Sequence, residues 1–270
     1  MKEICQDLTD EYESLDAIVA SLPEDRWQLI TAFYDWTIKT EIAHIAYFDG
    51  TARLAATDGE GFARHLKEEY EHKEVFRANH ERIRAWSPAK VLGYWRQERK
   101  ALVEALFPLS PKDRLPWYGP TMSARSFATA RIMETWAHGQ DIVDALGIDR
   151  EPTNRLQHIA HLGVTTFGWS YANRGLQVPD VPFRVELTAP SGELWAWGPP
   201  EARESVRGTA EDFCLVVVQR RHVEDTDLKV EGEVAREWML IAQAFAGPPA
   251  KGPKPGERTG KPGHSILGVR

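Results

Sequence analysis

The feature that most constrains the fold is a change in the spacing of apolar residues near residue 176. Before it, apolar side chains recur every three or four positions, as on one face of a helix; after it, they alternate with polar ones, as in half-buried strands. The sequence therefore predicts an α+β protein, with a helical domain over 1–176 and a smaller α+β domain over 177–246. Glycine, proline and lysine dominate 247–270, which we expect to be a disordered tail.

Capping residues mark several helix boundaries in the first domain. Thr37 and Ser87 can accept hydrogen bonds from backbone N–H groups at two helix starts, and Gly147 and Gly175 are placed to end two others. Between 107 and 121, four prolines and a glycine predict a long crossover loop. The expected helices are 2–21, 37–56, 60–86, 88–107, 123–146 and 152–174.

The second domain begins with a predicted hairpin. Residues 183–187 and 193–198 alternate between apolar and polar side chains, and Pro190-Ser191-Gly192 supplies the turn. We expect two further strands and two helices, over 205–207, 228–231, 209–221 and a last segment ending near 245.

Composition excludes several classes of partner. A formal charge of -7 opposes binding to nucleic acid or to an anionic membrane. The two cysteines, Cys5 and Cys214, are too few for a disulfide framework and favour a reducing compartment. No run reaches the roughly 20 apolar residues that span a bilayer, and the N-terminus is acidic where a signal peptide is basic. We therefore expect a cytoplasmic monomer or homodimer whose partners are small molecules.

One group of residues indicates chemistry. Glu134, His138 and Asp141 are offset by four and three positions in one predicted helix, so they share a face. His44 interrupts an apolar run in the second helix, where an unpaired buried imidazole is costly. Two histidines and a carboxylate are the ligand set of catalytic zinc and non-haem iron sites. The pattern predicts either such a metal site or a set of hydrogen-bonded polar residues in the core.

Neighbouring residues also have two interpretations each. Asp141 is either a solvent-side or capping carboxylate, or an acceptor that fixes the ring of His138 or its neighbour. Trp36 and Trp136 are either packing anchors or rings that face the substrate. Glu41-x-x-His44 is one half of a di-iron motif, but the second motif is Glu-x-x-x-His, which disfavours a di-iron site.

Two pairs of segments resemble a known family. Trp36-Thr37-x-x-x-Glu41-x-x-His44-Ile45, followed 90 residues later by Glu134-x-x-x-His138-Gly-x-Asp141, is similar to the metal-binding domain of mycothiol-dependent maleylpyruvate isomerases. That domain is a DinB-like four-helix bundle of the up-down-down-up type with a long crossover. Gly208-Thr-Ala-Glu-Asp212 and Leu228-Lys-Val-Glu-Gly232-Glu233 resemble the family's C-terminal domain, which has a sterol-carrier-protein-like α+β shape.

The resemblance implies a divalent metal, usually zinc, held by His44, Glu134 and His138, with Asp141 at the aspartate of the His-Gly-x-Asp signature. It also implies a low-molecular-weight thiol, mycothiol in actinobacteria, which binds at the metal as a thiolate and reacts with an electrophilic substrate. Arg220 matches an arginine of the family, and either Arg220 or Arg221 would bind a carboxylate of the substrate or thiol. The segment before Arg220 departs from the family's Leu-Trp-Gly-Arg.

The expected function is therefore a metal-dependent isomerase or S-transferase that uses a low-molecular-weight thiol and acts on a small electrophile. The alternative is a non-catalytic protein that holds a structural metal or none, with an apolar ligand beside Trp195, Trp197 and Phe213 in the second domain. A structural zinc site usually adds a further protein ligand, often cysteine, and neither Cys5 nor Cys214 is near these motifs in sequence.

Overall fold

The computed structural model of the protein describes residues 1–258, apart from the side chains of residues 73, 75 and 76, and divides the chain into two compact units, Met1–Ala145 and Leu146–Arg270. The predicted α+β class is confirmed: a helical unit is followed by a unit that combines helices with a four-stranded sheet. Among the described residues, no helix has the length and apolar character needed to cross a bilayer.

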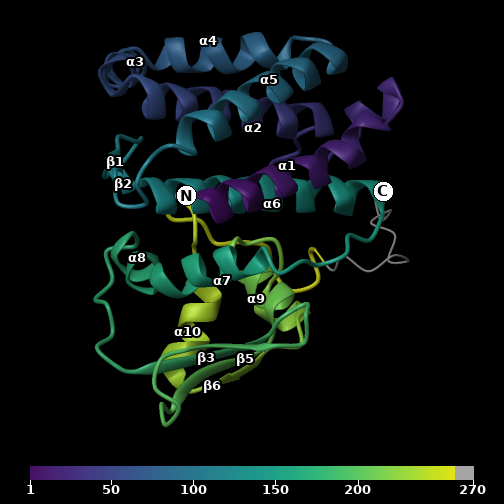
Figure 1. The fold of residues 1–270 in the computed structure, drawn as a ribbon. Coiled ribbons are helices and arrows are strands. Elements are labelled where there is room, and N and C mark those ends of the chain that lie inside the picture. The colour runs from purple at the N-terminus through teal and green to yellow at the C-terminus, as the bar shows by residue number, and fades with distance from the viewer. Residues whose placement is uncertain (259–270) are drawn as a thin grey trace. The chain divides into compact units, whose positions relative to one another are not determined.

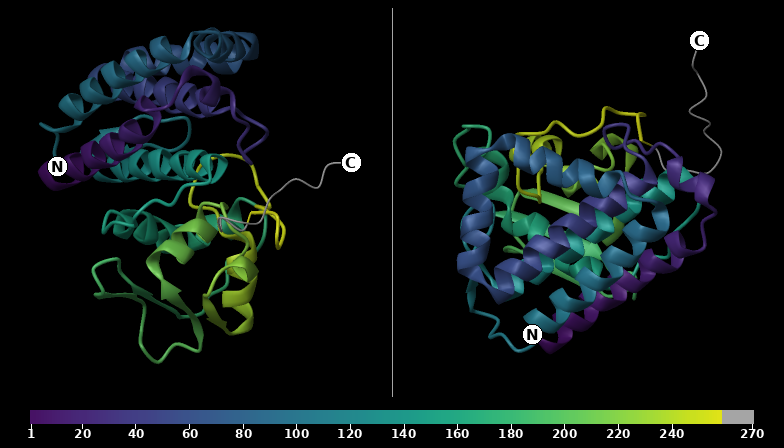
Figure 2. Two further views of the ribbon diagram at one scale, coloured as in Figure 1. Left: turned by 90° about the vertical axis from the view of Figure 1, so that its right-hand side faces the viewer. Right: turned by 90° about the horizontal axis from the view of Figure 1, so that it is seen from above.

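The first unit is a four-helix bundle with two added helices. In Figures 1 and 2, α2 packs on α5, while α3 and α4 cover the outer side of this pair and α1 and α6 lie on its other side. The crossover before α6 contains a small hairpin of β1 and β2. The elements are α1 (Lys2–Ala20), η1 (Glu24–Gln28), α2 (Ile38–Thr57), α3 (Gly59–Glu71), α4 (Lys73–Arg84), α5 (Pro88–Leu106), β1 (Arg114–Leu115), β2 (Met122–Ser123) and α6 (Ala124–Leu146).

Side-chain caps fix where these helices begin. Thr37 accepts from the Thr40 amide at 3.2 Å and Ser87 accepts from the Lys90 amide at 3.4 Å, as the sequence predicts. Asp58 caps α3 in the same way, through the Gly61 amide at 2.8 Å. Gly147 follows α6 with a φ of 66°, a left-handed conformation that suits glycine.

Two helices that the sequence predicts as continuous are each broken. The segment 60–86 divides into α3 and α4 at His72, whose φ of -128° is not helical. The segment 152–174 starts later and divides at Thr166 into α7 (Leu156–Thr165) and α8 (Phe167–Ala172). Thr165 and Thr166 donate their hydroxyls back to carbonyl oxygens of the preceding turn, a local bond that competes with regular helix geometry.

The second unit packs helices on one face of a mixed sheet. The strand order is β4-β3-β5-β6, with β3 and β5 parallel and the outer pairs antiparallel, and α9 and α10 pack on β5. Figure 1 shows α7 and α8 on the far side of these two helices from the sheet. The elements are β3 (Phe183–Thr188), β4 (Leu194–Trp197), β5 (Glu204–Thr209), α9 (Ala210–Val217), η2 (Val223–Asp225), β6 (Lys229–Glu231) and α10 (Glu233–Ile241).

The second unit extends beyond the predicted domain limits at both ends. Residues 146–176 belong to it, rather than to the bundle, because α7 packs on α9 and α8 on α10. Residues 247–258 of the predicted tail are held by hydrogen bonds, for example from the Ala250 amide to Gln243 at 3.1 Å and from the Gly256 amide to Asp225 at 2.9 Å. The rest of that tail, 259–270, lies outside the described residues.

One buried carboxylate joins four helices of the bundle. Asp49 of α2 is fully buried and accepts from Tyr12 of α1 at 2.7 Å, from Trp95 of α5 at 3.1 Å and from Arg131 of α6 at 2.9 Å. Burial by itself lowers the pKa of Arg131, but the adjacent Asp49 carboxylate raises it above its ordinary value. A charge buried this deeply is stable only while all its partners are in place.

Replacing this carboxylate should destabilise the bundle strongly. Asp49→Ala leaves the Arg131 charge and two polar groups buried without their acceptor, so we expect a loss of about 3–5 kcal/mol in the free energy of unfolding. Urea unfolding followed by far-UV circular dichroism measures it. The matched control is Glu60→Gln, an exposed position on α3, with an expected change within about 0.5 kcal/mol. Equal stability of the two variants would contradict the role given to Asp49.

Candidate metal centre

The predicted ligands come together between α2 and α6. His44 lies in the second turn of α2, and Glu134 and His138 lie one turn apart on α6. Each of the three offers one ligand atom, and these atoms all lie within 4.8 Å of one another. The Nε2 atom of His138 is 3.3 Å from Glu134 Oε2, and the ring centroids of His44 and His138 are 4.6 Å apart. The structure therefore brings together all three side chains that the sequence singled out.

The other nitrogen of His138 is held by Glu41. His138 Nδ1 is 2.7 Å from Glu41 Oε2, and Thr31 donates its hydroxyl to Glu41 Oε1 at 2.5 Å. Because a carboxylate only accepts, Nδ1 carries the proton, and in the neutral ring the lone pair is then on Nε2, on the side of Glu134. A carboxylate that fixes the tautomer and orientation of a histidine in this way is a recurrent feature of metal sites.

Asp141 is not the hydrogen-bond partner of that nitrogen. Its Oδ2 atom lies 3.8 Å from His138 Nδ1, beyond hydrogen-bond distance, whereas Glu41 lies within it. The sequence presented Glu41 only as a charge near the start of α2 and as part of a disfavoured di-iron motif. The signal that would have found it is the pairing of α2 with α6, which a single sequence does not reveal.

A second set of ligand atoms, from Glu41, His138 and Asp141, is also compact enough to hold a metal. All three of these residues are buried, with Glu41 and Asp141 at 0% exposure, so an ion there would have no open side. The side chain of Glu134, by contrast, is 27% exposed, and His44 is half-buried. A catalytic metal needs a position open to water or substrate, so the His44, Glu134 and His138 set fits that use better.

His44 is suited to hold a cation. Its Nδ1 atom is buried and has no hydrogen-bond partner among the residues that the structure describes, which is costly unless a ligand occupies it. Burial lowers the pKa of His44 well below its ordinary value, and repulsion from His138 when that ring is protonated, and from His80 and two arginines, lowers it further. The imidazole is therefore neutral at neutral pH, with a lone pair available to a metal. An unpaired nitrogen beside a carboxylate and a second imidazole fits a divalent ion.

Aromatic rings border the centre. Trp36 lies parallel to the His138 ring, at 6.1 Å between centroids and 7° between planes, and its centroid is 5.1 Å from that of His44. Phe33 meets His138 edge-on at 5.1 Å. Trp36 is half-buried and lies beside the rings of His44 and His138. Trp136, on α6, is buried, with 5% of its surface exposed.

The guanidinium of Arg84, at the end of α4, lies 4.6 Å from the centroid of the Trp36 ring. Nothing in the sequence distinguishes this arginine, because the same charged helix contains two others, Arg77 and Arg82.

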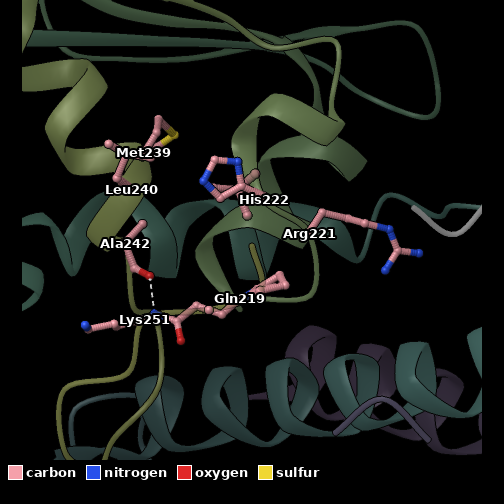
Figure 3. Close-up of a pocket in the computed structure, with 10 residues that line it drawn as sticks. Gln219, Arg221, His222, Met239, Leu240, Ala242 and Lys251 are labelled. Atoms are coloured by element: carbon pink, nitrogen blue, oxygen red, sulfur yellow. Dashed lines mark hydrogen bonds between the residues drawn. The ribbon is translucent and has the colours of Figure 1, made fainter. Parts of the chain in front are cut away.

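Arg220 and Arg221 lie in the second unit, after α9. Both are buried, and their guanidinium groups donate to the carbonyl oxygens of Val218 and Arg220 at 2.8 and 2.7 Å. A small pocket of this unit is shown in Figure 3, where Gln219 donates to the Ala242 carbonyl at 2.9 Å and the Arg221 side chain extends away from Met239. A role for either arginine in ligand binding stays a prediction.

Comparisons with known proteins agree with this architecture. A family model described as the mycothiol maleylpyruvate isomerase N-terminal domain matches residues 8–143, and one described as wyosine base formation matches residues 179–230. Uncharacterized proteins from two strains of Mycobacterium tuberculosis are each 47% identical over 247 residues, covering 91% of this chain and 96% of theirs.

Solved structures share the fold. Crystal structures of a mycothiol-dependent maleylpyruvate isomerase, one of a mutant and one not described as a mutant, match with TM-scores of 0.55 and 0.51 at 16% and 14% identity. Each match covers 80% of this chain and 87% of the other. Identity this low shows a shared fold and no more. The match of the family model to half of the chain shows more: this protein belongs to the mycothiol maleylpyruvate isomerase N-terminal domain family.

Proposed function

We propose that the protein is a metal-dependent enzyme of the isomerase or S-transferase class, which uses a low-molecular-weight thiol such as mycothiol and acts on a small electrophilic substrate. The observation that carries this proposal is the convergence of His44, Glu134 and His138 at one partly open position, with the remaining nitrogen of His138 held by Glu41. Membership of the family supports the thiol, because the solved isomerases of the same fold are described as mycothiol-dependent.

The donor set favours zinc among the divalent metals. Two imidazole nitrogens and one carboxylate oxygen are typical of catalytic zinc sites, and they also suit iron(II). When bound, such an ion lowers the pKa of a thiol that ligates it, so that a thiolate is present at neutral pH. The protein's own part is to fix the ligand geometry through Glu41 and Thr31 and to limit access of water through Phe33 and Trp36.

Metal content tests the ligand assignment. Elemental analysis should give about one zinc per chain in the wild type and almost none in His44→Ala or His138→Ala, because each variant removes one of only three protein ligands. His72→Ala, an exposed histidine between α3 and α4, is the matched control and should keep the metal. Full occupancy in both ligand variants would contradict the assignment. No metal in any protein after reconstitution would favour a non-catalytic protein with hydrogen-bonded core histidines.

A milder variant separates the two possible ligand sets. Glu41→Gln keeps the shape of the side chain but removes the charged acceptor of His138, so zinc affinity should fall by about 10- to 100-fold while saturation still gives one ion per chain. Competition with a chromophoric chelator measures the affinity. Glu134→Gln removes a ligand and should weaken binding more. The reverse order would place the ion in the Glu41, His138 and Asp141 set.

Thiol binding tests the reaction class. Cobalt(II) in place of zinc gives a visible spectrum that changes when sulfur enters the coordination sphere. We expect 2-mercaptoethanol to produce a sulfur-to-cobalt charge-transfer band in the wild type. The two cysteines of the chain are both buried, which limits their interference with this measurement. A spectrum that does not respond to thiol at saturating concentration would contradict the proposed thiol chemistry.

A further inference from the structure

A half-buried cation, Arg84, lies beside the proposed metal centre and has no ion-pair partner among the described residues. The Arg84 guanidinium makes no hydrogen bond or ion pair with any residue that the structure describes, and its Nε atom is shielded from solvent. Burial lowers the pKa of Arg84, yet an arginine stays charged at any pH at which the protein is folded. A shielded N–H group without an acceptor among the described residues is uncommon, and a bound water, ion or ligand is a common explanation for one.

The position of Arg84 relates it to the metal centre. Its guanidinium lies 4.6 Å from the centroid of Trp36, the ring that lies parallel to His138 and beside His44. Glu41 and Glu81 are near enough to influence the pKa of Arg84 by their charge, but neither forms an ion pair with it. The aromatic contact orients the guanidinium, and its N–H groups are not bonded to any described residue, so a ligand seated beside Trp36 could supply the acceptor.

We propose that Arg84 is the anion-binding residue of this site and that it holds a carboxylate of the small substrate. The planar fork of a guanidinium matches the two oxygens of a carboxylate. Three carboxylates, of Glu41, Glu134 and Asp141, already surround the centre, so a carboxylate group, which brings one charge to Arg84, is tolerated better there than a phosphate group, which brings up to two. This inference rests on the proposed function, because it assigns to the same site a residue, Arg84, that binds and orients the substrate.

Succinate binding to the zinc-loaded protein, measured by calorimetry, tests the proposal. Arg84→Met keeps an apolar stem against Trp36 but removes the charge, and should weaken succinate by about 10- to 100-fold. Arg84→Lys keeps the positive charge but lacks the planar fork, so its succinate affinity should lie between those of the wild type and Arg84→Met. The matched control is Arg82→Met, an exposed arginine on the same helix, which should bind as the wild type does. Zinc content and melting temperature are measured on every variant, because a purely structural role of Arg84 would change stability and leave succinate affinity unchanged.

The outcomes separate this inference from the proposed function. The assignment of Arg84 would be overturned by equal succinate affinity in Arg84→Met and Arg82→Met. It would also be overturned if the wild type does not bind succinate, or if it binds inorganic phosphate in preference to succinate. The source of the carboxylate is tested with 3-mercaptopropionate and 2-mercaptoethanol, which differ in that group. If Arg84→Met weakens the first thiol but not succinate, the carboxylate belongs to the thiol and the substrate assignment is wrong. If succinate binding depends on Arg84 but the cobalt(II) spectrum does not respond to thiols, this inference is supported and the thiol chemistry is refuted.

Discussion

The buried charge of Asp49 is the constraint on which the bundle and its site depend. Its bond to Arg131 joins α2 to α6, and the bond between Glu41 and His138 joins the same two helices farther along. Eight positions separate the two acids on α2 and seven separate their partners on α6, or about 12 and 10.5 Å of helix. Both links therefore fix one antiparallel register, and His44 and Glu134 face each other between them.

This arrangement explains how a polar centre persists inside a helical bundle. Asp49 has three donors, Glu41 is bonded on both oxygens, and His138 is bonded on Nδ1, so these buried groups are satisfied within the protein. By contrast, His44 Nδ1 and Arg84 Nε are buried without a hydrogen-bond partner among the described residues, and both lie where a ligand is proposed. The carboxylates that position the site, Asp49 and Glu41, are thus fully hydrogen-bonded, whereas the proposed contacts to metal and substrate each keep a nitrogen that can bind a ligand.

The sequence predicted the parts of this site that depend on a single helix. Glu134 and His138 share a face because they are four positions apart, and Thr37 and Ser87 cap helices because of their local geometry. It did not predict the roles of Glu41 and Arg84, which depend on the register of α2 against α6 and on the break at His72 that separates α4 from α3. The division of α7 from α8 was missed because threonine hydroxyls, rather than glycine or proline, interrupt the helix.

The most direct test of the account is the X-ray absorption spectrum of the zinc-loaded protein, recorded before and after a thiol is added. The account predicts two imidazole nitrogens and a carboxylate oxygen at about 2.0–2.2 Å with no sulfur, and then one sulfur at about 2.3 Å when the thiol is present. A sulfur ligand before thiol is added, a shell with fewer than two imidazoles, or no sulfur at saturating thiol would contradict the proposal that His44, Glu134 and His138 form a thiol-binding metal centre.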